Sequence, residues 1–445
     1  MKIIFILFFT LISFKPVFGQ SFYFENDSSV PIVEFSLAFR TGAGADPELK
    51  QGLTNLTAEM LLRGTQLRKK SKLEQAFDEL GSTIEMDIRS ELTIVRASVL
   101  SKNIQLFLEL VKEVLTEPKF DSQEFLKLKK QITSVLLSSL GSDAFLAQRG
   151  FDHFFFKKHP YSHYSMGSLS GMKFIQLVDI QNQYPKIFNK NDPILVGSGD
   201  TSSDVMEKWF DSLKSKLNSS NYKQILPAFQ PPPQLQVLIV DKPDRTQNTV
   251  VIGHIGKSFK DKDYFSFYLG NFGFGGRSFN ARLLQEIRVK RGWTYGISTS
   301  MSAGSQPKEW SINYTPTLKD TVPSIKHIIS MVNDLKNKGL TEAEYLFSKK
   351  NIVNSSKFSS NTPSKRVENK LIEMALDLPS GFFSNLGSEV KKSSLKEVNE
   401  SLANNVYPND LKIIIVGDGQ LLKPQIINAL RISSDNIFVK NYKEF

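Results

Sequence analysis

The stretch Gly52-Leu-Thr-Asn-Leu-Thr-Ala-Glu-Met-Leu-Leu-Arg-Gly-Thr65 predicts one amphipathic helix, around which the first half of the chain is organised. Its apolar residues recur at helical spacing and give the helix one buried face; they are Leu53, Leu56, Met60 and Leu61. Gly64 suits the C-terminal end of a helix, because glycine adopts the left-handed backbone there without strain. Residues four apart share a helix face, so Asn55 and Glu59 point the same way.

This segment resembles the metal-binding helix of the insulinase/pitrilysin family of zinc metallopeptidases. That family places an inverted zinc motif, His-x-x-Glu-His, between an opening Gly-Leu and a closing Gly-Thr. Here the frame is kept, but Asn55 stands at the first His position, Ala58 at the Glu position and Glu59 at the second His position. Two His on one face could bind zinc, and the Glu between them could act as general base. Asn is a poor zinc ligand and Ala cannot take a proton.

The family takes its last ligand, a Glu, from a second helix further along the chain. The family spacing from Glu59 leads to the neighbourhood of Val135, inside Lys127–Ser142. This run contains no Asp or Glu. The resemblance therefore implies a degenerate site at Asn55, Ala58, Glu59 and Val135, with no metal or other cofactor in this chain.

Composition sets wide limits on function. The chain has 445 residues, with 40% hydrophobic and 23% charged residues, which is enough for two globular domains. The formal net charge of +11 permits acidic partners, such as a membrane surface or acidic peptides. No nucleic-acid motif is present, and a solvated basic surface is the simpler interpretation. The absence of Cys excludes disulfides and thiolate zinc sites.

The N-terminus has the pattern of a secretion signal. Met1-Lys2 precedes the apolar run Ile3–Phe14, which is short for a membrane span but typical of a signal-peptide core. Residues 1–19 are therefore expected to be a signal peptide. The mature chain is expected in a bacterial periplasm, without a stable membrane span. The alternative is an uncleaved N-terminal anchor.

The remaining chain shows two halves with one order of elements. In the first half, strands and helices alternate in the order that follows: strand Ile32–Arg40, helices Gly52–Arg63 and Lys72–Leu80, strands Ser82–Ile88 and Leu92–Val99, helices Ile104–Thr116 and Gln123–Leu140, strand Ile194–Gly197 and helix Ser203–Leu217. Each rests on an apolar period of two or of three to four residues. The half ends on Gly199-Asp200 after its closing strand.

The second half repeats that order: strand Thr249–Ile255, a glycine-led helix Gly275–Val289, strands Trp293–Met301 and Trp310–Thr315, helices Pro323–Lys336 and Glu342–Lys357, and strand Ile413–Val416 before Gly417-Asp418. Matching spans of this length indicate an internal repeat. The proline-rich run 226–236 is expected to link residues 20–225 to residues 237–445. We therefore predict an α+β protein of two similar α/β-roll domains, each a mostly antiparallel sheet flanked by helices, forming a clam-like half-chamber.

The resemblance extends over nearly the whole mature chain. It includes Phe39–Gly44, Leu73–Gly81, and His159-Pro160-Tyr161 with Gly167 after it. In the second half it includes the segment from Gly275-Gly276 to Tyr295. There Arg288 and Tyr295 match the family's Arg/Tyr pair, which lies across the chamber from zinc and holds the substrate backbone. The resemblance implies that these two residues bind substrate or stabilise the oxyanion. Gly275 and Gly276 are expected to bind substrate, as part of a flexible glycine-rich hinge near the peptide channel.

These features predict a zinc-free, non-catalytic subunit of a heterodimeric insulinase-family peptidase. It is not expected to be active alone. Its predicted partners are a homologous subunit that carries zinc and a peptide or unfolded protein substrate, with no nucleic acid. Two alternatives stay open at this point. One is a peptide-binding or scaffold protein without a peptidase partner, and the other is an active metallopeptidase with unrecognised ligands.

Overall fold

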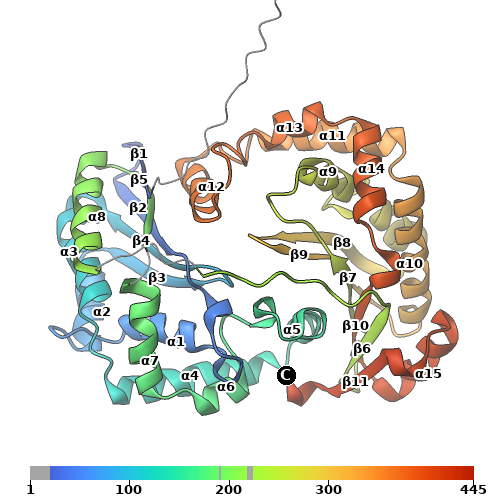
Figure 1. The fold of residues 1–445 in the computed structure, drawn as a ribbon, viewed down its shortest axis with the longest axis horizontal. Coiled ribbons are helices and arrows are strands. Elements are labelled where there is room, and N and C mark those ends of the chain that lie inside the picture. The colour runs from blue at the N-terminus through green and yellow to red at the C-terminus, as the bar shows by residue number, and fades with distance from the viewer. Residues whose placement is uncertain (1–20, 190–191, 218–223) are drawn as a thin grey trace, which may run out of the picture.

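The first half of the chain is built on a mixed five-stranded sheet with helices against it (Figure 1). The computed structural model describes residues 21–189, 192–217 and 224–445. The strands lie in the order β1-β5-β2-β4-β3. Only β1 and β5 are parallel, and the other neighbours are antiparallel. The strands are β1 (Phe22–Asn26), β2 (Ile32–Phe39), β3 (Ser82–Ile88), β4 (Thr93–Leu100) and β5 (Ile194–Gly199).

The second half repeats this sheet and adds one strand at its edge. Its order is β11-β6-β10-β7-β9-β8, so β6, β10, β7, β9 and β8 occupy the places of β1, β5, β2, β4 and β3. A parallel pair is again at the matching position, between β6 and β10, and the added strand β11 is also parallel to β6. The strands are β6 (Gln236–Asp241), β7 (Thr249–Ile255), β8 (Thr294–Ala303), β9 (Pro307–Pro316), β10 (Lys412–Gly417) and β11 (Ile437–Asn441). The predicted α+β fold of two similar units is confirmed.

The helices pack on these sheets through their apolar faces. Those of the first half are α1 (Leu53–Leu61), α2 (Lys70–Glu79), α3 (Ile104–Thr116), α4 (Ser122–Ser139), α5 (Asp143–Phe156), α6 (Leu169–Phe174), α7 (Leu177–Tyr184) and α8 (Ser203–Leu217). Those of the second half are α9 (Tyr264–Gly275), α10 (Thr321–Lys338), α11 (Glu342–Ser356), α12 (Pro363–Ala375), α13 (Leu386–Lys392), α14 (Leu395–Asn405) and α15 (Gly419–Leu430). Strands β5 and β10 are buried along their whole length, as expected for central strands covered on both faces.

One helix of each half packs against the sheet of the other half (Figure 1). Helix α12 of the second half packs on β5, β1 and β2 of the first sheet, while α5 of the first half packs on β10, β7 and β6 of the second sheet. Fully buried Leu371 of α12 joins Ala38, Ile94 and Val196 in one apolar cluster. The two halves therefore share cores, which the sequence repeat did not predict.

Polar contacts add to both exchanged helices. Glu368 of α12 accepts hydrogen bonds from Arg96 at 2.8 Å and Arg89 at 3.0 Å, both on the first sheet's β3–β4 hairpin. On α5, a side chain at Gly150 would contact Val240 and Ile414, with a Cβ only 3.2 and 3.3 Å from their methyl groups. Glycine at this position lets α5 approach the second sheet closely.

The segment 226–235 crosses between the halves without helix or strand, as the proline-rich composition predicts. Buried Lys412 on β10 holds it by donating to the carbonyl oxygen of Pro232 at 3.1 Å.

The boundaries 20–225, 226–236 and 237–445 stay predictions. The expected signal peptide, 1–19, lies outside the described residues. Within the part of the chain that the structure describes, no helix is long and apolar enough to cross a membrane.

One predicted helix is wrong. Residues Gly275–Val289 were expected to form a single glycine-led helix, but Gly275 is the last residue of α9, and a π-helix begins only at Leu284. Gly275 ends a helix that the sequence pattern does not indicate. Helix α9 is apolar almost all round and is buried between β8, α11 and α14, so it lacks the amphipathic period that marks a surface helix.

Candidate functional site

Helix α1 carries the degenerate motif as the sequence predicts. Asn55 and Glu59 are half-buried, and Ala58 has no exposed surface because it belongs to the core of the first half. Across the described residues, no group of three or more His, Asp or Glu side chains could hold a metal ion. The residues present here therefore do not fit the zinc ion that the motif would bind.

A buried carboxylate fixes the start of α1. Asp46 accepts hydrogen bonds from the backbone N–H of Gly52 at 2.7 Å and of Thr54 at 2.8 Å, and from the Thr54 hydroxyl at 2.6 Å. Gly52 has a φ of +101°, and Cβ at this position would meet Met172 and the backbone of Gly167. Burial raises the pKa of Asp46 to about 7, although these hydrogen bonds oppose the shift. The frame of the motif is thus held by packing and by a cap, without metal.

Glu59 lines a pocket of about 530 Å³ between α1, α2, α4 and β3. Burial raises the pKa of Glu59, and the positive charge of Arg63 opposes this. Arg63 donates to the side-chain oxygen of Gln131 on α4 at 3.0 Å, so Gln131 lies at the position that faces the motif. Val135, one turn later, is 40% exposed and is not among the residues that line this pocket.

Tyr295 lies at a β-bulge on the edge strand β8. Thr294 pairs with Pro316 and Ile297 with Tyr314, so Tyr295 and Gly296 together lie opposite the single residue Thr315. The Thr294 hydroxyl stabilises the bulge by donating to the carbonyl oxygens of Gly296 and Thr315, both at 3.0 Å. A bulge of this kind redirects a side chain away from the regular sheet surface. Tyr295 is 89% exposed.

Arg288 precedes this strand on the π-helix Leu284–Lys290, a rare conformation found frequently at functional sites. Its guanidinium lies over the ring of Phe279, 5.5 Å from the centroid. Phe279 is itself 71% exposed. Arg288 and Tyr295 are both exposed, on consecutive elements joined by a short turn, and their contact with substrate stays a prediction.

The surface around the pair is basic. Arg277, Arg288, Lys290 and Arg291 are exposed. Along the chain segment 277–295, Glu286 is the one acidic residue, and ion pairs with Lys290 and Arg291 lower its pKa. One acidic group offsets only part of this positive charge. A negatively charged ligand would be attracted to this face.

Gly275 and Gly276 have a packing role in this structure. Gly275 is buried, and a Cβ would lie 2.5 Å from the Thr299 side chain and 2.8 Å from that of Leu283. At Gly276 a Cβ would lie 2.8 Å from the backbone of Phe272. Glycine is needed at both positions for α9 to end against β8. Their predicted contact with substrate stays a prediction.

The edge hairpins of the two sheets meet at their tips. Glu91, between β3 and β4, accepts a hydrogen bond from the backbone N–H of Ser305, between β8 and β9, at 3.1 Å. Tyr161 donates to the same carboxylate oxygen at 2.8 Å, and Lys308 lies over the Tyr161 ring. These contacts join the hairpin of β3, which borders the degenerate motif, to the hairpin of β8, which carries Tyr295.

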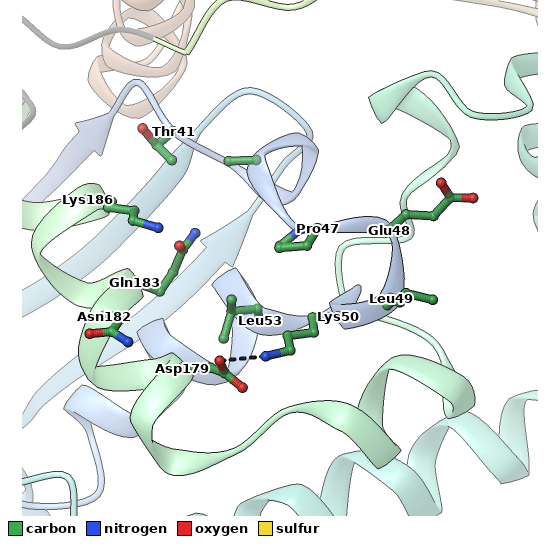
Figure 2. A pocket seen from close by; sticks show the side chains of 11 residues that line it. Thr41, Pro47, Glu48, Leu49, Lys50, Leu53, Asp179, Asn182, Gln183 and Lys186 are labelled. Atoms are coloured by element: carbon green, nitrogen blue, oxygen red, sulfur yellow. Dashed lines mark hydrogen bonds and ion pairs between the residues drawn. The ribbon is translucent and has the colours of Figure 1, made fainter.

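A second pocket, of about 870 Å³, opens at the N-terminal end of α1 (Figure 2). The loop 41–50 forms one wall and α7 with the residues after it forms the other. Lys50 and Asp179 bridge these walls by an ion pair of 2.6 Å. No sequence motif marks this pocket, because its walls are more than a hundred residues apart in the chain and only the fold brings them together.

The comparisons with known proteins agree with this geometry. Residues 22–138 match the family model "Insulinase (Peptidase family M16)" and residues 175–352 match "Peptidase M16 inactive domain". A Helicobacter pylori protein named "Non-peptidase homolog YmxG" is 26% identical over 412 residues, covering 89% of this chain and 91% of its own length. A Bacillus subtilis protein named "Uncharacterized zinc protease YmxG" is 21% identical over 415 residues, covering 89% of this chain and 96% of its own.

Among solved structures, the chain is similar to a peptidase M16 inactive domain from Pseudomonas fluorescens. The TM-score is 0.82 at 20% sequence identity, over 90% of this chain and 96% of the other. The first family match covers most of the first half, and the second runs from α7 of the first half to α11 of the second half. The chain belongs to the insulinase family, peptidase family M16.

Proposed function

We propose that this chain is the zinc-free, non-catalytic subunit of a heterodimeric insulinase-family peptidase. It binds extended peptide and contributes Arg288 and Tyr295 to the active site of a homologous, zinc-bearing partner. The observation that carries the proposal is the contrast between the two halves. The motif positions on α1 are unsuited to metal, whereas Tyr295 stands on a bulge and is 89% exposed.

Both sheets present an edge suited to an extended peptide. Among the described strands, β3 has β4 as its single neighbour and β8 has β9. The outer backbone groups of an edge strand can accept a further strand, and this is a recurrent way of binding peptides. The pocket beside Glu59 borders β3, and Tyr295 belongs to β8. The tip-to-tip contact of the two hairpins would keep these edges in a constant relation while peptide binds.

Tyr295 and Arg288 are suited to complementary roles. The Tyr295 hydroxyl is a hydrogen-bond donor that can point at the oxyanion formed on the scissile carbonyl. The Arg288 guanidinium presents several donors in one plane, which can hold a substrate carbonyl. Its stacking on Phe279 limits the positions of the guanidinium before substrate arrives. Preorganised donors of this kind lower the barrier because they need no reorientation during the reaction.

The name of the Helicobacter pylori relative, a non-peptidase homologue, supports the zinc-free part of the proposal. The expected secretion signal supports a periplasmic location. The proposal would be tested by reconstitution: the mature chain is combined with a candidate homologous subunit that has an intact His-x-x-Glu-His motif. Peptide cleavage is then measured for each chain alone and for the pair. We expect cleavage only in the mixture; equal turnover by the partner alone would overturn the proposal.

A further inference from the structure

The loop that joins α9 to the following π-helix presents a cation and an aromatic ring to solvent. Arg277 is exposed, and Phe279 is 71% exposed. The backbone N–H of Ser278 donates to the carbonyl oxygen of Gly276 at 2.6 Å, so Arg277 is the central residue of a tight turn. The side-chain amide of Gln285 donates to the carbonyl oxygen of Phe279 at 2.5 Å and ties the loop to the helix. The backbone that carries both exposed side chains is therefore held in one place.

Three other cations of this segment already have carboxylate partners. Arg282 donates to Glu344 of α11 at 2.7 Å. Lys290 and Arg291 both form ion pairs with Glu286. The charge of Arg282 is thus balanced within the chain, whereas one carboxylate shared by two cations leaves one positive charge in excess.

Arg277 and Arg288 have no such partner. In the part of the chain that the structure describes, no carboxylate lies within ion-pair distance of either guanidinium. Arg288 lies over the Phe279 ring, 5.5 Å from its centroid, and Val289 beside it is 58% exposed. Two uncompensated cations beside exposed apolar side chains suit a ligand that carries a negative charge next to an apolar group.

The neighbouring edge strand indicates what kind of ligand this is. Strand β8 begins at Thr294, directly after these cations, and the structure describes no strand on its outer side. Backbone pairing there selects an extended peptide, because a lipid headgroup or a nucleic acid offers no row of N–H and C=O groups. A peptide paired with β8 would pass Tyr295, and its side chains at the start of the strand would lie next to the π-helix.

We propose that this surface selects peptides in which an acidic side chain stands next to an apolar one, with Arg277 as the residue that recognises the acid. The carboxylate accepts from the Arg277 guanidinium, which can present two parallel donors to it. Arg288 adds to the positive potential, and the apolar side chain contacts Phe279. This inference rests on the proposed function, because the same face would hold the substrate, and it adds a substrate class. Arg277 takes no part in the chemistry.

The test is fluorescence anisotropy of three labelled peptides titrated with the purified chain at low ionic strength. The peptides differ at one position, which is Glu, Gln or Lys between two leucines. We expect the Glu peptide to bind about threefold more tightly than the Gln peptide and the Lys peptide to bind most weakly, since an exposed ion pair changes binding by up to about fivefold. Salt at about 0.5 M should remove most of this preference, because it screens exposed charges. Equal binding of the Glu and Gln peptides, or no saturable binding of either, would overturn the proposal.

Variants assign the preference to one side chain. Arg277→Gln should bind the Glu and Gln peptides equally, and Arg277→Glu should reverse the order, so that the Lys peptide binds most tightly. A purely structural role of Arg277 would not produce this reversal. Arg431→Gln is the matched control and should keep the wild-type order, because Arg431 is exposed on α15, which packs on β6, three strands away from β8. Thermal unfolding checks that each variant is folded. An Arg277→Glu chain that still prefers the Glu peptide would contradict the assignment.

Two further measurements separate this inference from a membrane surface and from the proposed function. We expect no binding to vesicles of phosphatidylcholine with phosphatidylserine; vesicle binding that Arg277→Gln abolishes, without any peptide preference, would overturn the inference. Cleavage by the reconstituted pair with equal kcat/KM for the Glu and Gln peptides would overturn this inference and leave the proposed function standing. No cleavage by the pair, with the Glu preference retained in binding, would overturn the proposed function and still support the peptide class.

Discussion

The phenol oxygen of Tyr161 lies 2.8 Å from Oε1 of Glu91 and donates a hydrogen bond to it, and this pair of first-half residues contacts the β8–β9 hairpin of the second half. The same carboxylate oxygen accepts from the backbone N–H of Ser305. The N–H of Gln306 donates to the Tyr161 hydroxyl at 3.3 Å. The Tyr161 side chain thus connects the tips of the two hairpins whose outer strands we propose for peptide binding.

Removal of the Tyr161 hydroxyl should loosen this junction. A buried hydrogen bond to a charged group contributes about 1.5–3 kcal/mol, so Tyr161→Phe should lower the free energy of unfolding by roughly this amount. Burial raises the pKa of Tyr161, so the phenol stays protonated and donates throughout the working pH range. Urea unfolding measures the change, with Tyr442→Phe as control. A loss of less than about 0.5 kcal/mol, within the usual range for surface substitutions, would contradict the assigned role.

The exchanged helix α12 makes a second prediction. Leu371 belongs to the second half, yet it is fully buried against the first sheet. Leu371→Ala should cost about 2–5 kcal/mol through lost contacts and the cavity left behind. Because the halves share this core, both should unfold at lower denaturant in one transition, followed by tryptophan fluorescence from Trp209 and Trp310. Leu346→Ala, at a position that is 55% exposed, serves as control. Unfolding of the second half alone at unchanged stability of the first would argue against a shared core.

Asp46 gives a pH-dependent prediction. Its pKa is raised from 3.8 to about 7 in the folded chain by burial, so the folded state holds this proton more tightly than the unfolded state. The protonated Asp46 carboxyl therefore makes its full contribution to the free energy of unfolding below its pKa in the unfolded chain. This contribution is lost as pH rises through about 7. Asp46→Asn removes the titration. Its free energy of unfolding should therefore fall less steeply between pH 5 and pH 8 than that of the wild type.

The same substitution should also weaken the cap. An amide offers one acceptor oxygen, whereas Asp46 uses both oxygens for its three donors. One backbone donor is left unsatisfied, which costs about 1–3 kcal/mol at pH 7. Asp211→Asn is the matched control, because the Asp211 side chain is largely exposed. Parallel pH profiles for wild type and Asp46→Asn would contradict the raised pKa of this carboxyl.

The prediction that this chain binds no zinc can be tested on the unmodified chain and on variants in which zinc ligands are introduced. Elemental analysis of the mature chain should find far less than one zinc per chain. The combination Asn55→His, Glu59→His and Gln131→Glu should create zinc binding, because Gln131 lines the same pocket as Glu59. With Val135→Glu in place of Gln131→Glu, zinc binding should be much weaker, since Val135 does not line this pocket. One tightly bound zinc in the unmodified chain would refute the zinc-free assignment.

Much of the fold could be predicted from the sequence because the local signals are strong. The apolar period of Ile104–Thr116 and the alternation of Thr249–Ile255 give α3 and β7 with the predicted ends. The order of elements in the two halves, read as a repeat, gives two sheets of matching topology. Local periodicity and turn residues were enough for these elements.

Other features depend on the fold as a whole. Helix α9 is largely buried and carries no amphipathic period, so the sequence pattern does not mark it. The exchange of α5 and α12 depends on contacts between residues far apart in the chain. For the site, family spacing indicated Asn55, Ala58, Glu59, Arg288 and Tyr295, but it led to Val135 rather than to Gln131. The helix phase that brings Gln131 to Arg63 is set by packing of α4 on α1.

The central claim is that Tyr295 acts on a peptide held at a partner's active site. It is tested most directly by turnover of a reconstituted complex that contains Tyr295→Phe. This change keeps the ring and removes only the hydroxyl, and the exposed position makes no demand on folding. Tyr268→Phe, on α9 and packed against the core of the second half, is the control. Loss of one oxyanion donor typically lowers turnover by about 10²–10³-fold, and the account predicts this loss with normal assembly. A Tyr295→Phe complex that assembles normally and turns over within about twofold of wild type, roughly 0.4 kcal/mol, would contradict it.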